Sequence, residues 1–294
     1  LYAGKDRRKP RKEHLAELDA LVFDIQDIGC RFYTYISTMG LCMEAAEEAG
    51  IRFVVLDRVN PIGGEKVAGP LRDGESKFVA FHDIPVQHGM TVGEIARLYR
   101  SERFPGLDLT VLPLRNWKRS MRFDETGLPW TRPSPNMPNL MAATLYPGIG
   151  LLEFTNLSVG RGTNLPFEVV GAPYIAPEDL ATELTAARLP GLQFIPVRFT
   201  PESSVFAGQE CGGVRILLKD PAKCPAVELG LALGQALRRL HAEQWEPGKL
   251  NTLLCHPSTE QGILALRPRP TITSSWREDL AAFKERRRKH LLYQ

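Results

Sequence analysis

The stretch ALVFDIQDIGCRFYTYISTMGLCMEAAEEAGIRFVVLD, residues 20–57, predicts how the first half of the chain folds. Two short apolar runs, residues 20–23 and 51–56, are typical of buried strands, and each is followed by an aspartate. Between them, apolar side chains recur at helical spacing up to Ala49, and Gly50 suits a left-handed helix cap. The stretch therefore predicts a β-α-β unit with two parallel strands.

The sequence beyond residue 57 continues this alternation of strands and helices. Thr91 and Glu94 form a capping box that predicts the start of a helix, and residues 109–112 predict a further strand. The first half is therefore α/β, with a mainly parallel sheet covered by helices on both faces. Ligands of such sheets bind beyond the carboxyl ends of the strands, so the polar residues after each strand are the first candidates for chemistry.

Five prolines between residues 129 and 147 predict a connecting segment without regular structure. We place a domain boundary at its end and predict an α/β domain over residues 1–147, followed by an α+β auxiliary domain over residues 148–294. The predicted elements of the second domain are strands at residues 193–199 and 213–218, a helix from Ala226 with Pro225 at its first turn, and a final helix from about Ser275.

Composition and charge exclude several classes of protein and of partner. The 294 residues are 43% hydrophobic and 24% charged, which excludes disordered, collagen-like and coiled-coil chains. Basic residues gather in residues 1–12 and 284–290, and the remainder carries more acids than bases. We expect these ends to be solvated tails, and no nucleic-acid partner, because the basic run at residues 5–9 contains no aromatic side chain to stack on bases. No membrane span is expected, because no apolar run reaches about eighteen residues.

The spacing of cysteines, histidines and glycines bears on metals and cofactors. The five cysteines form no C-x-x-C pair and the six histidines no H-x-x-x-H pair, so we expect neither a disulfide framework nor a metal site. The chain lacks the G-x-G-x-x-G and G-x-x-x-x-G-K-[ST] fingerprints, so no nucleotide cofactor is expected. It also lacks the G-x-S-x-G elbow of serine hydrolases.

A dense group of polar side chains follows the first predicted strand: Asp24, Gln26, Asp27, Arg31 and Tyr33. A carboxylate here is suited to acid, base or nucleophilic catalysis, and a guanidinium is suited to grip an anionic substituent. For each residue alone, a helix cap or a salt bridge that closes the β-α turn explains the sequence equally well. For the group as a whole, the density favours a functional site.

The next strand is followed by a similar group. Asp57 and Asn60 come directly after it, with the Pro61 turn and Gly63-Gly64 permitting a close approach of the backbone. His88 precedes the capped helix, where an imidazole would face the same sheet edge, although a lone histidine is more often structural.

Polar residues near the predicted domain boundary complete the candidates. Asn136 lies in a proline-rich turn, and Glu153, Asn156 and Arg161 lie within residues 153–163, a loop with no apolar periodicity. An acid, an amide and an arginine among paired glycines suit a polyhydroxylated or anionic ligand. The alternative interpretation of this loop is a turn between domains.

Six motifs follow one another along the chain: DIQDIGCRFYTYISTM (24–39), VVLDRVNPIGG (54–64), PVQHGMTVGEIA (85–96), SPNMPN (134–139), LYPGIGLLEFTNLSVGRGT (145–163) and FAGQECGGVRI (206–216). Taken in order, they resemble the DUF1343 family, whose known activity is that of exo-β-N-acetylmuramidases. The resemblance implies a Rossmann-like first domain and hydrolysis of N-acetylmuramic acid from the non-reducing end of peptidoglycan-derived glycans, in the cell envelope or outside the cell.

The resemblance implies roles for the candidate residues. Glycoside hydrolysis uses two carboxyl groups, and Glu153 and Asp27 are the first choices, with Asp57 next. Muramic acid carries a lactyl carboxylate, for which Arg31 or Arg161 is a bidentate partner. The remaining predicted substrate-binding residues are Asp24, Gln26, Tyr33, Asn60, His88, Asn136 and Asn156.

Two departures from the family pattern stand beside these assignments. Family members carry a further N-terminal segment with a Gly-Pro-Glu-His-Gly motif, whose glutamate is a catalytic candidate, so we expect this chain to begin downstream of it. Ala68 stands where many members have an acid. The alternative function is therefore a catalytically incomplete protein that binds muramyl glycans. A nucleotide-sugar transferase is disfavoured, because the phosphate-binding loops are missing.

Overall fold

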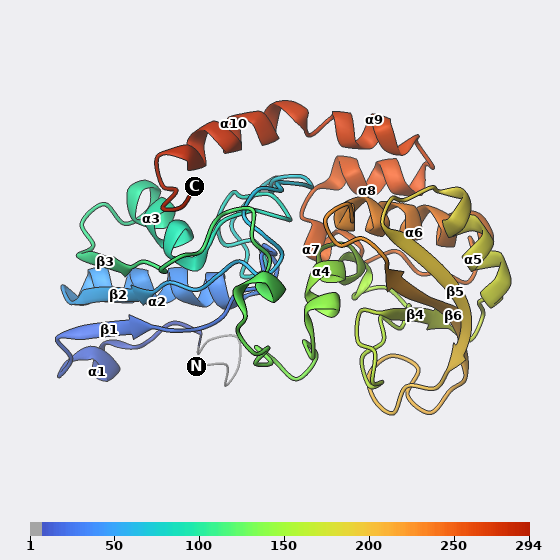
Figure 1. The fold of residues 1–294 in the computed structure, drawn as a ribbon, viewed down its shortest axis with the longest axis horizontal. Helices are drawn as coiled ribbons and strands as arrows, with labels where there is room; N and C mark the ends of the chain where they lie inside the picture. The colour runs from blue at the N-terminus through green and yellow to red at the C-terminus, as the bar shows by residue number, and fades with distance from the viewer. Residues whose placement is uncertain (1–7) are drawn as a thin grey trace. The chain divides into compact units, whose positions relative to one another are not determined.

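A computed structural model describes residues 8–294, which form two compact units. Unit 1 comprises the described residues up to 67, residues 75–129 and residues 281–294, and unit 2 comprises residues 68–74 and 130–280. Each unit contains one three-stranded sheet (Figure 1). The domain boundary predicted after residue 147 falls within the helix at Leu140–Ile149, which belongs to unit 2. A division of the chain into domains at residue 147 stays a prediction.

Unit 1 contains the predicted β-α-β unit and its continuation. Three parallel strands lie in the order β1 (Ala20–Phe23), β2 (Arg52–Leu56) and β3 (Leu109–Leu112). Helix α2 (Tyr35–Ala49) connects the first two, and α3 (Val92–Glu102) precedes the third. A short helix, α1 (Lys12–Leu15), precedes β1. The α/β class predicted from the sequence is confirmed.

The two predicted helix caps are present in unit 1. Gly50 ends α2 in the left-handed conformation, at φ 68°. Thr91 and Glu94 close the capping box at the start of α3, with the Thr91 side chain accepting from the backbone N–H of Glu94. Both caps are local in sequence, so the pattern of a few residues specifies them.

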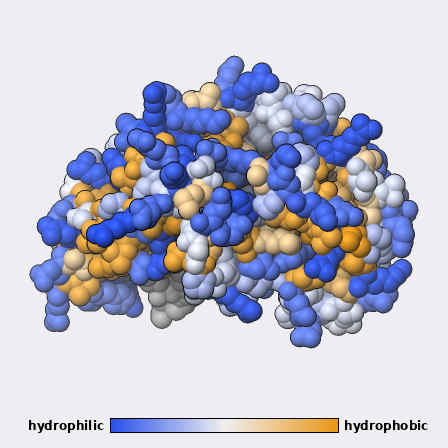
Figure 2. Space-filling view, in the orientation of Figure 1, coloured by the Kyte–Doolittle hydropathy of each residue, from blue (hydrophilic) through white to orange (hydrophobic). Residues whose placement is uncertain are grey.

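The sheet of unit 1 is covered on one face and partly exposed on the other. Helices α2 and α3 pack on its strands and on each other. The side chains of Val22 and Leu112 are 56% and 51% exposed, and Figure 2 shows apolar side chains at the surface over these strands. The expectation of helices on both faces was wrong for the described residues, which supply helices to one face only.

The basic ends are partly packed rather than fully solvated. Residues 284–288 belong to helix α10 (Arg277–Arg288), and Arg287 is buried. At the other end, Lys9 pairs with Glu44 and Glu48. Lys5 and Arg7 lie outside the described residues. The prediction of a solvated tail at residues 284–290 was wrong for Arg287 and His290, which are buried. Charge counting does not register hydrogen bonds to distant backbone, such as those from Arg287 to the carbonyls of His88 and Gly89.

Unit 2 is α+β, as predicted. Its antiparallel sheet has the order β4 (Val169–Ala172), β6 (Cys211–Leu218), β5 (Leu192–Phe199). Gly148 and Gly230 let two of its helices meet closely, since a Cβ at Gly148 would lie 1.8 Å from the carbonyl oxygen of Ala226. The helices are α4 (Leu140–Ile149), α5 (Pro177–Ala186), α6 (Ala226–Leu240), α7 (Asn251–Leu254), α8 (Pro257–Leu264) and α9 (Arg269–Ser274).

The proline-rich segment contains a helix that the sequence analysis missed. Asn139 caps α4 by accepting from the backbone N–H of Ala142 at 2.8 Å. Four of the five prolines precede Asn139, so Pro147 alone falls inside the helix. The prediction of an irregular segment up to residue 147 was therefore wrong over its second half. Among the described residues, no helix combines the length and apolarity needed to cross a membrane.

Candidate active site

Asp27 and His88 meet in the interior of unit 1, beyond the carboxyl end of β1. Oδ2 of Asp27 lies 3.3 Å from Nε2 of His88, and the two residues are 3% and 0% exposed. Nδ1 of His88 accepts from the backbone N–H of Met90 at 3.2 Å. A neutral imidazole therefore carries its proton on Nε2, facing the carboxylate.

The two oxygens of Asp27 have different surroundings. Oδ2 accepts from the backbone N–H of Gly29 at 2.7 Å and faces His88. Oδ1 is buried and has no hydrogen-bond partner among residues 8–294. A buried carboxylate oxygen without a donor is costly, and such groups are found where chemistry requires them.

The loop that carries Asp27 is anchored on the segment that carries His88. Cys30 and Gln87 form an isolated antiparallel bridge, and the backbone N–H of Arg31 donates to Val86 at 2.9 Å. The Arg31 side chain is 1% exposed and donates through Nη1 to the carbonyl of Ile84 at 3.1 Å. Its guanidinium therefore faces backbone rather than solvent. Tyr33 is also buried in this loop.

Asp57 connects β2 to the start of α3. Its Oδ1 accepts from the backbone N–H groups of Gly93 and Arg58, at 2.7 and 2.9 Å. Its Oδ2 accepts from the hydroxyls of Thr91 and Tyr293, at 2.7 and 2.5 Å. Burial raises the pKa of this carboxyl above its ordinary value, although the four donors oppose the shift. Asp57 is thus held by donors on every side, as a positioning group would be.

Asn60 contacts both the loop that carries Asp27 and the turn that carries His88. Its side chain donates to the carbonyl of Met90 at 3.1 Å and accepts from the backbone N–H of Ile62 at 3.2 Å. Gly29 packs directly on it, since a Cβ at Gly29 would lie 2.5 Å from Asn60 Oδ1. Asn60 therefore touches both sides of the Asp27–His88 pair.

Gln26 and Asp24 lie nearer the surface of unit 1. The Gln26 amide donates to the carbonyls of Asp27 and Val59, at 2.6 and 2.9 Å. Asp24 forms an ion pair with Arg58, at 2.6 Å, in which both side chains are largely exposed. In the described residues, these two side chains brace the loops after β1 and β2.

Glu153 and Arg161 form an accessible ion pair in unit 2. Glu153 follows the short 3-10 helix η3 (Gly150–Leu152), and its Oε1 lies 2.6 Å from Nε of Arg161. The side chains are 20% and 28% exposed. The Arg161 guanidinium also lies over the ring of Phe167, 5.1 Å from its centre. This leaves a partly exposed guanidinium held by a carboxylate and a ring.

The two remaining predicted residues also lie in unit 2. Asn156 donates to the carbonyl of Gln244 and accepts from Glu246 and Tyr174, at 2.8, 2.7 and 3.2 Å. Its amide is therefore committed to the fold of this unit. Asn136 is half-buried in the segment that precedes α4.

The structure adds a buried cluster that the sequence analysis missed: Glu94, Arg119 and Arg287. Arg119 pairs with Glu94 and donates to the carbonyls of Gly64 and Gly89, at 3.1 and 2.9 Å. Burial, with the nearby charge of Arg119, lowers the pKa of Arg287 to about 10. Arg119 and Arg287 both donate to the carbonyl of Gly89. Arg287 lies almost two hundred positions from Gly89 in the sequence, so no local sequence pattern identifies this contact.

Metal-binding geometry is not seen within residues 8–294, where no group of three or more His, Cys, Asp or Glu side chains is placed to hold an ion. The five cysteines are all buried and free. Burial raises the pKa of the Cys42 and Cys211 thiols to about 11, so they are poor nucleophiles at neutral pH.

Comparison with known proteins gives matches along the chain. Residues 1–141 and 144–293 match the family profiles described as the N-terminal and C-terminal parts of the exo-beta-N-acetylmuramidase NamZ. The chain is 43% identical over 290 residues to the peptidoglycan beta-N-acetylmuramidase NamZ of Bacillus subtilis (strain 168), covering 97% of this chain and 70% of that protein.

Solved structures of similar fold come from Bacteroides fragilis NCTC 9343. Two DUF1343 family proteins match with TM-scores of 0.91 and 0.80, at 34% and 32% sequence identity. The first match covers 99% of this chain and 79% of that one, and the second covers 97% and 78%.

Proposed function

Because this chain belongs to the NamZ family of exo-β-N-acetylmuramidases, we propose that it removes N-acetylmuramic acid from the non-reducing end of peptidoglycan-derived glycans. It is a glycosidase, and its reaction is the hydrolysis of a β-glycosidic bond. Such a reaction needs one carboxyl group that protonates the leaving oxygen and a second that attacks carbon or activates water.

The buried pair of Asp27 and His88 is the observation that supports an assignment in unit 1. Asp27 has one oxygen turned to the imidazole and one without a donor, so it can accept a proton at Oδ1 without breaking an existing hydrogen bond. We propose Asp27 as an acid–base group and His88 as the residue that orients it. Asn60 holds the loop on which both depend.

Glu153 is the second catalytic candidate, on the basis of its own surroundings in unit 2. It is partly exposed, and its Oε1 lies 2.6 Å from Nε of the Arg161 guanidinium. An ionised carboxylate is the form that attacks carbon or activates water. Asp57 ranks below both, because its two oxygens already accept four hydrogen bonds.

Arg161 is our candidate for recognition of the lactyl carboxylate that distinguishes muramic acid from glucosamine. Nε faces Glu153 while the side chain stays 28% exposed, so the outer edge of the fork is available to a second carboxylate. Arg31, the other cation predicted for this role, is 1% exposed and bound to backbone. We therefore propose that Arg31 shapes the Asp27 loop and does not contact substrate.

The test is release of chromophore from an aryl β-N-acetylmuramide, with the matching aryl β-N-acetylglucosaminide as the control substrate. Turnover of the muramide alone supports the proposal, and turnover of the glucosaminide at an equal rate contradicts the muramyl specificity. A folded protein that binds the muramide without cleaving it would instead act as a muramyl-glycan binding protein.

A further inference from the structure

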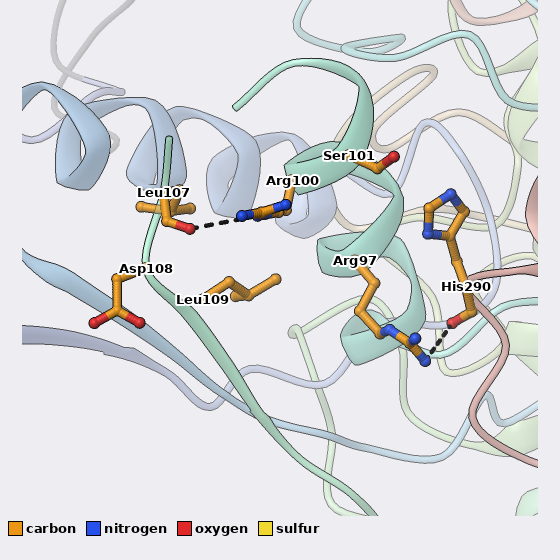
Figure 3. Close-up of a pocket in the computed structure, with 7 residues that line it drawn as sticks. All are labelled: Arg97, Arg100, Ser101, Leu107, Asp108, Leu109 and His290. Carbon is orange, nitrogen blue, oxygen red and sulfur yellow. Dashed lines mark hydrogen bonds between the residues drawn. The ribbon is translucent and has the colours of Figure 1, made fainter. Parts of the chain in front are cut away.

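Residues 281–294 form part of unit 1 and are bound to its α3 and β3 region at several points. Figure 3 shows one of them, where Arg97 on α3 reaches the carbonyl oxygen of His290 while the imidazole points away. The other contacts are Arg97 to the carbonyl of Leu291, the N–H of Leu292 to Glu94, the N–H of Leu114 to the hydroxyl of Tyr293, and the N–H of Arg119 to the carbonyl of Gln294.

Arg287 is the deepest charged side chain of this segment. It is 7% exposed, and its Nη1 lies 2.6 Å from the carbonyl oxygen of Gly89 and 3.1 Å from that of His88. The same guanidinium also reaches the carbonyls of Gly64 and Glu65, at 3.3 and 3.4 Å. One side chain thus holds two separate stretches of backbone.

The missing side chain at Gly89 leaves room for the Arg287 guanidinium. The φ of Gly89 is +59°, and a Cβ there would lie 2.6 Å from Nη1 of Arg287 and 2.6 Å from the carbonyl oxygen of Lys66. The absence of a side chain therefore allows Arg287 to lie directly on the turn. Charge-assisted hydrogen bonds to carbonyl oxygens are among the stronger polar contacts in a protein, so the turn is fixed by them.

The turn that Arg287 holds carries His88. The Arg287 contacts are made to the carbonyls of His88 and Gly89. The His88 imidazole accepts from the backbone N–H of Met90, two positions further on, while facing Asp27. We propose that Arg287 is a positioning residue that sets the orientation of His88 toward Asp27. The expected effect of Arg287 on turnover rests on the proposed function. The orientation of His88 does not, and it can be measured without an activity assay.

The test compares two variants at Arg287 with a control on the same helix. Arg287→Met keeps an unbranched, flexible side chain and removes its donors, whereas Arg287→Lys keeps the charge and loses the fork. Arg288→Met is the control, because Arg288 is 78% exposed and pairs only with Glu285 among the described residues.

Steady-state kinetics on the aryl muramide measure the effect of each variant on kcat and on KM separately. We expect kcat to fall about 10- to 100-fold in Arg287→Met, as for other residues that orient a reacting group, with KM changed less than about twofold. Arg287→Lys should recover part of the loss, and Arg288→Met should match wild type. Equal kcat in wild type and a folded Arg287→Met would overturn the effect on catalysis.

The imidazole signal of His88 in NMR spectra of histidine-labelled protein, assigned with His88→Gln, reports the positioning directly. We expect it to shift in Arg287→Met and, by less, in Arg287→Lys, and to stay in place in Arg288→Met. An unmoved His88 signal in either folded Arg287 variant overturns the proposal. If Asp27→Asn keeps full turnover while the His88 signal still shifts, the proposed function of Asp27 fails and the positioning role of Arg287 stands.

Discussion

The phenol of Tyr293 donates to Oδ2 of Asp57 at 2.5 Å, although 236 positions separate the two residues along the chain. The contact adds a fourth donor to a buried carboxylate that already accepts from Thr91, Gly93 and Arg58. It fastens the last described residues of unit 1 to the end of β2.

Tyr293→Phe should lower the free energy of unfolding by about 1–3 kcal/mol, because it removes one donor from a buried carboxylate. Tyr99→Phe is the matched control, since Tyr99 is fully buried and its hydroxyl has no hydrogen-bond partner within residues 8–294. Chemical denaturation of both variants gives the comparison. Equal losses in the two would show that the Tyr293 hydroxyl contributes nothing specific.

Asp57 should give stability a measurable pH dependence. Burial raises its pKa in the folded protein, so the folded state binds this proton more tightly than the unfolded state does. Its contribution is therefore fully present below the unfolded pKa of about 3.9 and is lost as pH rises through the raised folded value. The unfolding free energy of wild type minus that of Asp57→Asn should accordingly decrease from pH 4 upward. A difference that grows with pH contradicts the sign of the shift.

Asp27→Asn should lower kcat for the aryl muramide by about 10²- to 10⁴-fold, the range typical of a lost acid–base group, with a smaller change in KM. Asp19→Asn is the control, since Asp19 is exposed at the opposite end of β1. Steady-state kinetics measure kcat and KM of both variants, and circular dichroism verifies that both are folded. A folded Asp27→Asn with normal kcat would remove Asp27 from the mechanism.

Arg161→Ala should weaken binding of muramic acid far more than binding of N-acetylglucosamine, because only the former carries the lactyl carboxylate. Arg198→Ala serves as the control in the same unit, where Arg198 forms an exposed ion pair with Glu210. Isothermal titration with the two sugars measures the ratio. An equal loss for both sugars is incompatible with a carboxylate clamp at Arg161.

Gly29→Ala should destabilise the protein more than Gly74→Ala does. Both glycines have positive φ, +85° and +87°, so the backbone strain of about 1–2 kcal/mol is shared. Only at Gly29 would the new Cβ meet the side chain of Asn60, at 2.5 Å, while nothing lies within 4 Å of Gly74. Thermal unfolding of the pair isolates the packing on Asn60, and identical shifts would show that the contact relaxes freely.

The sequence predicted the features of the fold that depend on neighbouring residues. The β-α-β unit follows from two apolar runs and the Gly50 cap, and α3 follows from the Thr91–Glu94 capping box. Helix α4 was missed because prolines before Asn139 outweighed the cap at Asn139 itself. Propensity averaged over a window cannot show where a proline run ends and a helix begins.

The candidate site was predicted in part for a similar reason. Asp27 and His88 were both singled out by their place beside predicted elements, and the structure brings them to 3.3 Å. Their roles in catalysis stay predictions. Arg287 and Tyr293 were not singled out, since their partners lie about two hundred positions away and each is a single polar residue in a basic or terminal stretch. Contacts of that range leave no periodicity to detect.

Unit 1 is discontinuous, and this bears on the order of events during synthesis. Residues 281–294 emerge from the ribosome only after residues 130–280. Until then, Glu94, Asp57 and the Gly89 turn lack their contacts with Leu292, Tyr293 and Arg287, respectively. Domains tend to fold as they are made, and contacts of long sequence separation form slowly. Unit 2 can therefore acquire its structure before unit 1 is complete, and the turn that bears His88 receives its Arg287 contacts only after residues 130–280 have been made.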